Sequence, residues 1–345
     1  MGSVADRILR EQARDTDGAI VAEHLCRVYQ TGSAVRRNRK ETIAAEDISF
    51  GVPAGTIFGM LGPNGAGKTT TIQMLSTLLA PSRGTARVHG YDVRRDEQMV
   101  RRQLGVVLGG DRGLYGQLPA WDNLVYFGTL YGMRKEAIGR RAESLLDLVG
   151  LRDRAGDRVE RYSRGMKQRL HLAKALLHDP PVLFLDEPSI GLDPAAAADL
   201  RQAIAALAPA HTVLLTTHDM YEADLLCREI AIVNRGRIVA QGSPTELKAR
   251  VAGTRRVVIS SMAVQEGQGN EIEPRLSRLP GVQHVNRVTN PAGGSEWTLL
   301  CPNTSLTLDG ALAILRDVGA PVTAVQVFEP TLEDAFLTIA GSSLS

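Results

Sequence analysis

The feature that most constrains this chain is a glycine-rich segment between an apolar run and a helix-like stretch. The run Thr56–Leu61 predicts a short buried strand, and it leads directly into Gly62-Pro-Asn-Gly-Ala-Gly-Lys-Thr-Thr70. The residues that follow, to about Leu79, predict a helix that ends at Pro81 and Gly84. A strand, a glycine-rich turn and a helix in this order are the context of a phosphate-binding loop. An accidental glycine-rich turn is the alternative, and the flanking elements argue against it.

The residue types of this loop suit phosphate chemistry. Backbone N–H groups must point inward around phosphate oxygens, in conformations that a side chain would block, so glycines are needed at Gly62, Gly65 and Gly67. The helix that follows offers its unsatisfied N–H groups and its dipole to the same anion. We expect Lys68 to reach the β- and γ-phosphates of a nucleotide and Thr69 to ligate Mg²⁺.

A second candidate site follows the apolar run Val182–Leu185, which ends at Asp186 and Glu187. A buried strand that ends in carboxylates places them at the carboxyl edge of a parallel sheet, where α/β proteins bind ligands. We expect Asp186 to hold Mg²⁺ through a water molecule and Glu187 to polarise an attacking water. Many strands end in solvated acids, so the pattern gains its weight from the phosphate-binding loop earlier in the chain.

Composition limits the remaining possibilities. The 345 residues predict roughly two domains, and a formal net charge of +2 gives no reason to expect binding to nucleic acid. Three scattered cysteines exclude a disulfide scaffold and a cysteine-rich zinc site. No apolar stretch approaches the length of a membrane-spanning helix. The basic segment 32–40 predicts a solvated loop, with a nucleic-acid or lipid contact as the alternative.

The order of elements predicts two domains after a flexible tail at residues 1–18. Helices and buried strands alternate over residues 50–230, which favours an α/β core with a largely parallel sheet, and Glu229–Val239 predicts a hairpin. Beyond Gly253 the pattern becomes strand, helix, strand, strand, helix, strand, which is the order of a ferredoxin-like motif. Its expected elements are 255–260, 271–279, 282–289, 296–300, 306–318 and 322–328, and a last helix is expected at 331–339. The domains are therefore expected at 19–250 and 251–345.

A third motif, Tyr162-Ser-Arg-Gly-Met-Lys-Gln168, opens a predicted helix in which Ser163 is a good N-cap. By itself it could be an ordinary capped helix. Taken with the phosphate-binding loop, with Asp186-Glu-Pro-Ser-Ile-Gly-Leu-Asp193 and with Thr217-His-Asp219, it resembles the ATP-binding subunit of an ABC transporter over about residues 20–245. The sequences YSRGM and Pro330-Thr-Leu-Glu-Asp-Ala-Phe336 are most similar to exporters of drugs and natural products of the daunorubicin-resistance type.

The resemblance implies a fold and a function. The fold would be α/β, a P-loop NTPase domain of the ABC ATPase type with a helical subdomain, followed by a small α+β C-terminal domain. The chain would hydrolyse ATP with Mg²⁺ and power a separate integral membrane permease from the cytoplasmic face of the cell membrane. Two copies would form a head-to-tail dimer with two ATP molecules between them, and nucleic acid would not be a partner. A soluble regulatory ATPase of the ABC type, without a membrane partner, is the alternative.

The resemblance also implies residue roles. Lys68, Glu187 and His218 would be catalytic, Asp193 would belong to the D-loop at the dimer interface, and Thr69 and Asp186 would bind Mg²⁺. Tyr29 would stack on adenine, unless it is simply a partly buried strand residue. ATP would be bound by Tyr29, Gly62, Pro63, Asn64, Gly65, Ala66, Gly67, Lys68, Thr69 and Thr70. The ATP of the opposing copy would be contacted by the signature residues Ser163, Arg164, Gly165 and Met166.

Two positions depart from the family pattern. Gly110 stands where the family usually has a glutamine that contacts Mg²⁺ and relays to the membrane partner, and Gln117 lies too far along the chain to replace it. Either a neighbour such as Asp111 substitutes for the glutamine, or the coupling is altered. Arg164 stands where many members have glycine, and a cation near a phosphate is electrostatically compatible. The C-terminal domain is expected to tune dimerisation, with ligand sensing as the alternative.

Overall fold

The chain divides into two compact units, residues 1–243 and 244–345, which are described separately. The computed structural model describes residues 18–31, 40–108, 113–251, 255–262, 269–289, 294–302 and 304–342. The division differs from the expected one by the helix α9 (Pro244–Ala249), which packs against α12 (Leu332–Ser342) in the second unit. Among the described residues, no helix is both long enough and apolar enough to span a membrane.

The first unit is built on a ten-stranded sheet with the order β5-β4-β1-β2-β10-β9-β3-β8-β7-β6. The strands, in chain order, are β1 Ile20–Thr31, β2 Lys40–Val52, β3 Ile57–Leu61, β4 Arg83–Val88, β5 Tyr91–Asp92, β6 Leu104–Val107, β7 Val182–Asp186, β8 Thr212–Thr217, β9 Glu229–Asn234 and β10 Arg237–Gly242. Strands β9, β3, β8, β7 and β6 run parallel to one another, whereas β10 is antiparallel to β9, and β1 is antiparallel to β2 and β4. The parallel part confirms the expected α/β core, and the antiparallel part extends it.

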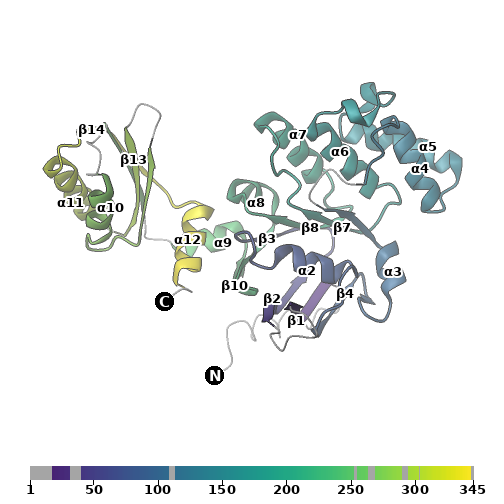
Figure 1. Ribbon diagram of the computed structural model, residues 1–345, viewed down its shortest axis with the longest axis horizontal. Coiled ribbons are helices and arrows are strands. Elements are labelled where there is room, and N and C mark those ends of the chain that lie inside the picture. Colours follow the sequence, from purple (N-terminus) through teal and green to yellow (C-terminus); the bar gives the residue numbers. More distant parts are fainter. Residues whose placement is uncertain are drawn as a thin grey trace. The chain divides into compact units, whose positions relative to one another are not determined.

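Helices cover the sheet on both sides (Figure 1). The α-helices of this unit are α2 Lys68–Leu75, α3 Glu97–Arg102, α4 Ala120–Leu130, α5 Lys135–Leu148, α6 Arg164–Ala175, α7 Pro194–Ala205 and α8 Met220–Leu226. Two short 3₁₀ turns, Arg152–Arg154 and Val159–Arg161, lie between α5 and α6. Helix α2 contacts β2, β4 and β7, so the sheet curls around it. Helices α4, α5 and α6 pack on one another as a helical group, as expected.

The parallel strands place the motifs at one edge of the sheet. Every residue of β3, β7 and β8 is buried, which matches their continuous apolar runs. In the ladder, Leu61 lies opposite Thr217, and Asp186 lies opposite Thr216. The glycine-rich loop after β3, the carboxylates after β7 and His218 after β8 therefore leave the sheet side by side.

Several expectations for the first unit need correction or fall outside the described residues. Helix α2 ends at Leu75 and not at Leu79, because Thr77 takes the left-handed conformation with φ 62°. The hairpin of β9 and β10 is confirmed. The proposed N-terminal tail and the basic loop lie almost entirely outside the described residues, as do Gly110 and Asp111.

The second unit has the order of elements expected for a ferredoxin-like fold, with α9 before it and α12 after it. Its elements are β11 Arg255–Ser261, α10 Gly269–Ser277, β12 His284–Thr289, β13 Ser295–Cys301, α11 Thr304–Asp317 and β14 Val322–Phe328. The antiparallel sheet has the order β12-β13-β11-β14, and residues of α10 and α11 join its apolar core around the fully buried Trp297. Thr331 and Asp334 cap α12 reciprocally, since each backbone N–H donates to the other side chain.

Candidate nucleotide site

The loop between β3 and α2 requires its glycines for reasons of packing as well as of phosphate access. A Cβ on Gly62 would lie 2.3 Å from the carbonyl oxygen of Val233, and one on Gly67 would lie 2.4 Å from that of Ala44. Gly65 has open space around it but takes φ +81°, which L side chains rarely adopt. The loop is therefore held tightly against neighbouring backbone directly before α2.

The ammonium group of Lys68 is held inside this loop. Lys68 is only 4% exposed, and its Nζ donates to the carbonyl oxygens of Gly62 at 2.7 Å and Pro63 at 3.1 Å. Its third oxygen contact is the ion pair with Glu187 Oε1 at 3.3 Å. A buried cation stabilised by three oxygens is positioned to exchange some of them for phosphate oxygens.

Asp186, at the end of β7, meets two hydroxyl groups. Thr69 Oγ1 donates to Asp186 Oδ1 at 3.2 Å, and Thr216 Oγ1 donates to the same oxygen. Asp186 is buried, so these bonds satisfy an anion that has little access to water. A carboxylate and a hydroxyl at one point are oxygen donors of the kind that Mg²⁺ prefers, and the pair fits that ion.

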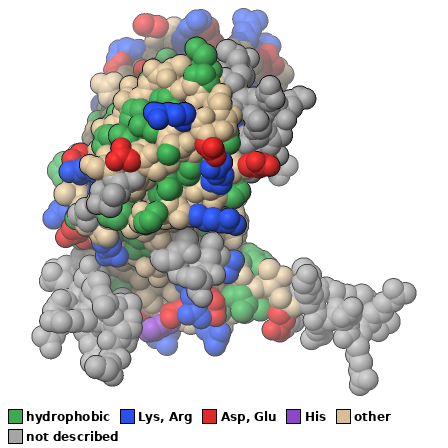
Figure 2. All heavy atoms as spheres, turned by 90° about the vertical axis from the view of Figure 1, so that its left-hand side faces the viewer, with side chains coloured by type: hydrophobic (Ala, Val, Ile, Leu, Met, Phe, Trp, Pro, Cys, Tyr) green, Lys and Arg blue, Asp and Glu red, His purple; other side chains and the backbone are tan. Residues whose placement is uncertain are grey.

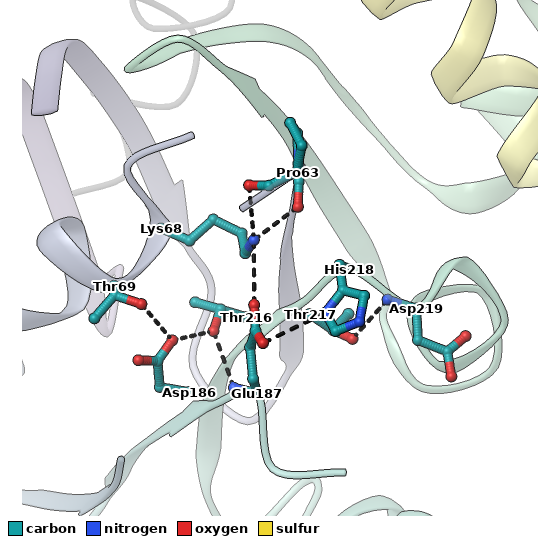
Figure 3. A network of polar contacts seen from close by, with 10 residues as sticks. Pro63, Lys68, Thr69, Asp186, Glu187, Thr216, Thr217, His218 and Asp219 are labelled. Carbon is teal, nitrogen blue, oxygen red and sulfur yellow. Dashed lines mark hydrogen bonds and ion pairs between the residues drawn. The ribbon is translucent and has the colours of Figure 1, made fainter. Parts of the chain in front are cut away.

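Glu187 connects the two loops that follow β7 and β8 (Figure 3). Its carboxylate contacts Lys68 through Oε1 and His218 Nδ1 through Oε2 at 3.4 Å. Its backbone takes φ 49°, a conformation that costs a non-glycine residue about 1 kcal/mol or more. The strained backbone is fixed by hydrogen bonds from its N–H to the carbonyl oxygen of Thr216 at 3.0 Å and to the Thr216 hydroxyl at 3.2 Å. The structure thus brings together Lys68, Thr69, Asp186, Glu187 and His218.

Thr216 is the residue of this site that the sequence analysis missed. Its hydroxyl joins Asp186 to the backbone of Glu187, and its side chain is fully buried. The signal in the sequence was a pair of threonines at the end of an otherwise apolar run, directly before His218. Such a pattern also fits a plain buried strand, so only the pairing of β7 with β8 identifies its role.

The signature residues lie apart from this cluster in the described chain. Ser163 caps α6, accepting a hydrogen bond from Met166 N at 3.2 Å, as predicted. A Cβ on Gly165 would lie 2.6 Å from the Cβ of Ala196 on α7. No described hydrogen bond or ion pair joins these residues to Lys68 or Glu187.

The loop that precedes α7 contacts the start of α6 as well. Asp193 caps α7 through a hydrogen bond from Ala196 N at 2.9 Å. The guanidinium group of Arg164 lies against Gly191, where a Cβ would be 2.2 Å from its Nη1. Because Gly191 has no side chain, it leaves the space that the guanidinium group of Arg164 occupies. Arg164, which departs from the family pattern, therefore packs against a glycine of the same chain.

Two further positions were singled out from the sequence. Tyr29 is half-buried in β1, and the guanidinium carbon of Arg27 lies 5.0 Å from its ring centroid. Its expected contact with adenine stays a prediction. Gln117 donates to Glu160 at 2.7 Å, so its amide is already engaged within the chain.

A separate cavity of about 860 Å³ in the first unit is markedly basic. Arginines 101, 102, 140 and 141 line it together with Asp179, which pairs with Arg141 at 2.6 Å. Arg101 pairs with Glu97 at 3.1 Å, so two of the four arginines already have a carboxylate partner, and the lining as a whole is net positive.

Comparison with known proteins agrees with this geometry. A family model described as ABC transporter matches residues 45–190. The linearmycin resistance ATP-binding protein LnrL of Bacillus subtilis (strain 168) is 33% identical over 88% of this chain and 96% of its own length. The daunorubicin resistance ATP-binding protein DrrA3 of Streptomyces coeruleorubidus is 38% identical over 86% of this chain and 91% of its own length.

Solved structures show the same fold. The ATP-binding subunit of an ABC transporter has a TM-score of 0.56 at 28% identity, covering 67% of this chain and 92% of that one. A dimeric ATP-binding cassette bound to ADP and Pi has a TM-score of 0.58 at 22% identity, covering 65% and 98%. With the phosphate-binding loop, the paired carboxylates and His218 assembled at one sheet edge, the chain belongs to the ATP-binding proteins of ABC transporters and is an ATPase.

Proposed function

We propose that this chain is the ATP-hydrolysing subunit of an exporter for a drug or natural product. The exported compound would pass through a separate integral membrane permease, with the chain bound at the cytoplasmic face of the cell membrane. The printed names of its relatives, which include resistance to linearmycin and to daunorubicin, support export. The observation that carries the hydrolytic role is that one carboxylate, Glu187, contacts both Lys68 and His218.

Each residue of the cluster has a part in transferring the terminal phosphoryl group to water. Lys68 would bind the β- and γ-phosphates, and the N–H groups of the loop would bind the remaining phosphate oxygens. Glu187 would orient the attacking water and accept its proton, while His218 would contact the γ-phosphate. Thr69, together with Asp186 through a water molecule, would hold Mg²⁺, which neutralises phosphate charge when bound. Positioning and charge stabilisation then supply most of the rate acceleration.

The signature residues would act on the ATP of a second copy. Ser163 and Gly165 lie at the start of α6, where backbone N–H groups can bind an anion, and they make no described contact with the chain's own Lys68 cluster. Arg164 would add a positive charge, and Asp193 would lie at the same interface. A neighbour in fold that was solved as a dimer supports this arrangement.

The permease is the second proposed partner. We assign the arginine-lined cavity to an acidic segment of the permease, because the cavity is positively charged and complementary charges favour binding. Extraction of membranes with detergent tests the assignment of a membrane partner. The chain should be recovered with an integral membrane protein, and recovery of the chain alone would overturn the transporter role.

Replacement of Glu187 by glutamine tests the hydrolytic role. The amide keeps the shape of the side chain but cannot accept the proton, so we expect ATP to bind with little change and turnover to fall about 10²- to 10⁴-fold. ATP binding and phosphate release should be measured on the same preparation. Glu136→Gln, at an exposed position of α5, is the matched control and should leave turnover unchanged. Normal turnover in Glu187→Gln would show that Glu187 is not the base.

A further inference from the structure

The strand β14 is an edge of the second unit's sheet and has few neighbours. It pairs antiparallel with β11 on one side, and it is the last strand in the order β12-β13-β11-β14. Six of its seven residues are exposed. Its sequence, Val-Thr-Ala-Val-Gln-Val-Phe, contains no charged residue and no proline. Soluble proteins usually protect an edge strand with such residues, because its free N–H and C=O groups are a template for pairing with another chain.

The other edge of the same sheet is protected. Strand β12 carries His284 and Arg287, and the guanidinium carbon of Arg287 lies 5.0 Å from the ring centroid of Trp297. Arg287 also donates to the Ser295 hydroxyl at 3.1 Å. Within one small sheet, therefore, one edge is charged and the other is uncharged.

The exposed side chains of β14 are largely apolar. Val325 is 38% exposed, Val327 48% and Phe328 39%, so three large apolar side chains of one strand meet water. Figure 2 shows one face of the molecule, on which hydrophobic side chains lie between charged ones. The nearest charges are already engaged, since Arg256 lies over the ring of Phe328 and Glu329 pairs with Arg255. A partner for this edge should therefore be apolar and uncharged.

A second copy of β14 meets these conditions. If two copies pair antiparallel about Val325, the opposed pairs are Val325 with Val325, Ala324 with Gln326, Thr323 with Val327, and Val322 with Phe328. No like charges oppose one another, and most pairs contain a β-branched or aromatic residue, which favours cross-strand packing. A two-fold axis through Val325 makes the contact self-complementary and closed.

We propose that β14 pairs with β14 of a second copy, joining two four-stranded sheets into one of eight strands. This contact is distinct from the proposed ATP-dependent dimer, because it uses the C-terminal unit and needs no nucleotide. A seven-residue strand is only about 23 Å long, so the contact buries a small area and should be weak by itself. It would raise the effective concentration of one nucleotide site for the other.

The test uses the full chain without nucleotide. Sedimentation velocity over a wide range of protein concentration should show a monomer–dimer equilibrium. Val325→Lys places two ammonium groups opposite each other at the two-fold axis, so we expect dimerisation to weaken at least about tenfold. Val288→Lys, the same change on the exposed, opposite edge β12, is the matched control and should dimerise as the unaltered chain does.

A mixture of variants separates lost pairing from lost folding. Val325→Lys and Val325→Asp should each be monomeric, whereas their mixture should form a heterodimer through the opposed charges. A monomeric unaltered chain, equal dimerisation by Val325→Lys, or a mixture that stays monomeric would overturn the proposal. ATP-induced dimerisation of Glu187→Gln, measured in parallel with and without Val325→Lys, reports on the nucleotide dimer separately. If Glu187→Gln does not dimerise when ATP is added, the proposed function is contradicted, but the proposed β14 contact is not.

Discussion

Glu222 gives the most discriminating prediction about stability. It lies on α8, directly beyond His218, and is completely buried. Neither carboxylate oxygen has a well-formed hydrogen bond within the described structure, although the hydroxyl groups of Thr217 and Ser189 lie close enough to interact with the carboxyl. Burial raises the pKa of this carboxyl above its usual value, and Asp219 raises it further. The hydroxyls of Thr217 and Ser189 and the charge of Arg201 oppose this in part.

The raised pKa fixes the sign of the pH dependence. At pH values between the pKa of Glu222 in the unfolded chain and its pKa in the folded chain, the folded chain binds more protons than the unfolded chain. The contribution of Glu222 to stability is therefore fully present below the unfolded pKa and is lost as the pH rises through the folded pKa. At neutral pH the group therefore destabilises the fold. Glu222→Gln supplies a neutral side chain of the same shape. The substitution should raise the free energy of unfolding by about 1.4 kcal/mol for every pKa unit by which folding raises the pKa of Glu222.

Thermal unfolding of the two proteins across pH checks this reasoning. For a unit of this size, 1 kcal/mol corresponds to about 2–4 °C in Tm. Glu222→Gln should melt above the unaltered chain near pH 8, and the gap should close near pH 4, about the usual pKa of a glutamate. Glu136→Gln, an exposed change, should show no such closing gap. A lower Tm for Glu222→Gln than for the unaltered chain at neutral pH would refute the raised pKa of Glu222. A difference in Tm that stays the same at all pH values would refute it as well.

Two further substitutions test the packing of the nucleotide site. Thr216→Val removes a hydroxyl group that donates to buried Asp186, so we expect the free energy of unfolding to fall by about 1.5–3 kcal/mol. We also expect its ATPase activity to need a higher Mg²⁺ concentration. The control Thr212→Val, on the same strand, should destabilise the chain less and leave the Mg²⁺ dependence unchanged. Gly165→Ala forces α6 away from α7 because its Cβ would meet Ala196, so stability should fall by about 1–3 kcal/mol and turnover should drop. The double variant with Ala196→Gly should recover both, and failure to recover would point to another cause.

The sequence by itself determined the family, the ATP-site motifs and most elements of both units. These follow from local patterns: an apolar run before Gly62, an apolar run before Asp186, and a period of two or 3.6 residues in the C-terminal segment. These predictions succeed because each pattern depends only on residues that are close together in the chain. The end of α2 was placed too late for the same reason, since the left-handed Thr77 is not marked by a glycine.

Only the tertiary structure decided which distant residues meet. The contacts of Thr216 with Asp186, of Gly165 with Ala196 and of Arg164 with Gly191 all depend on how strands pair and helices pack. The burial of the Glu222 carboxyl is equally invisible in the sequence, because a glutamate on a short helix is usually solvated. The same holds for β14, because its sequence predicts a strand but only its position at the sheet edge shows that the strand is exposed. Burial and pairing partners are properties of the assembled fold, and no residue carries them alone.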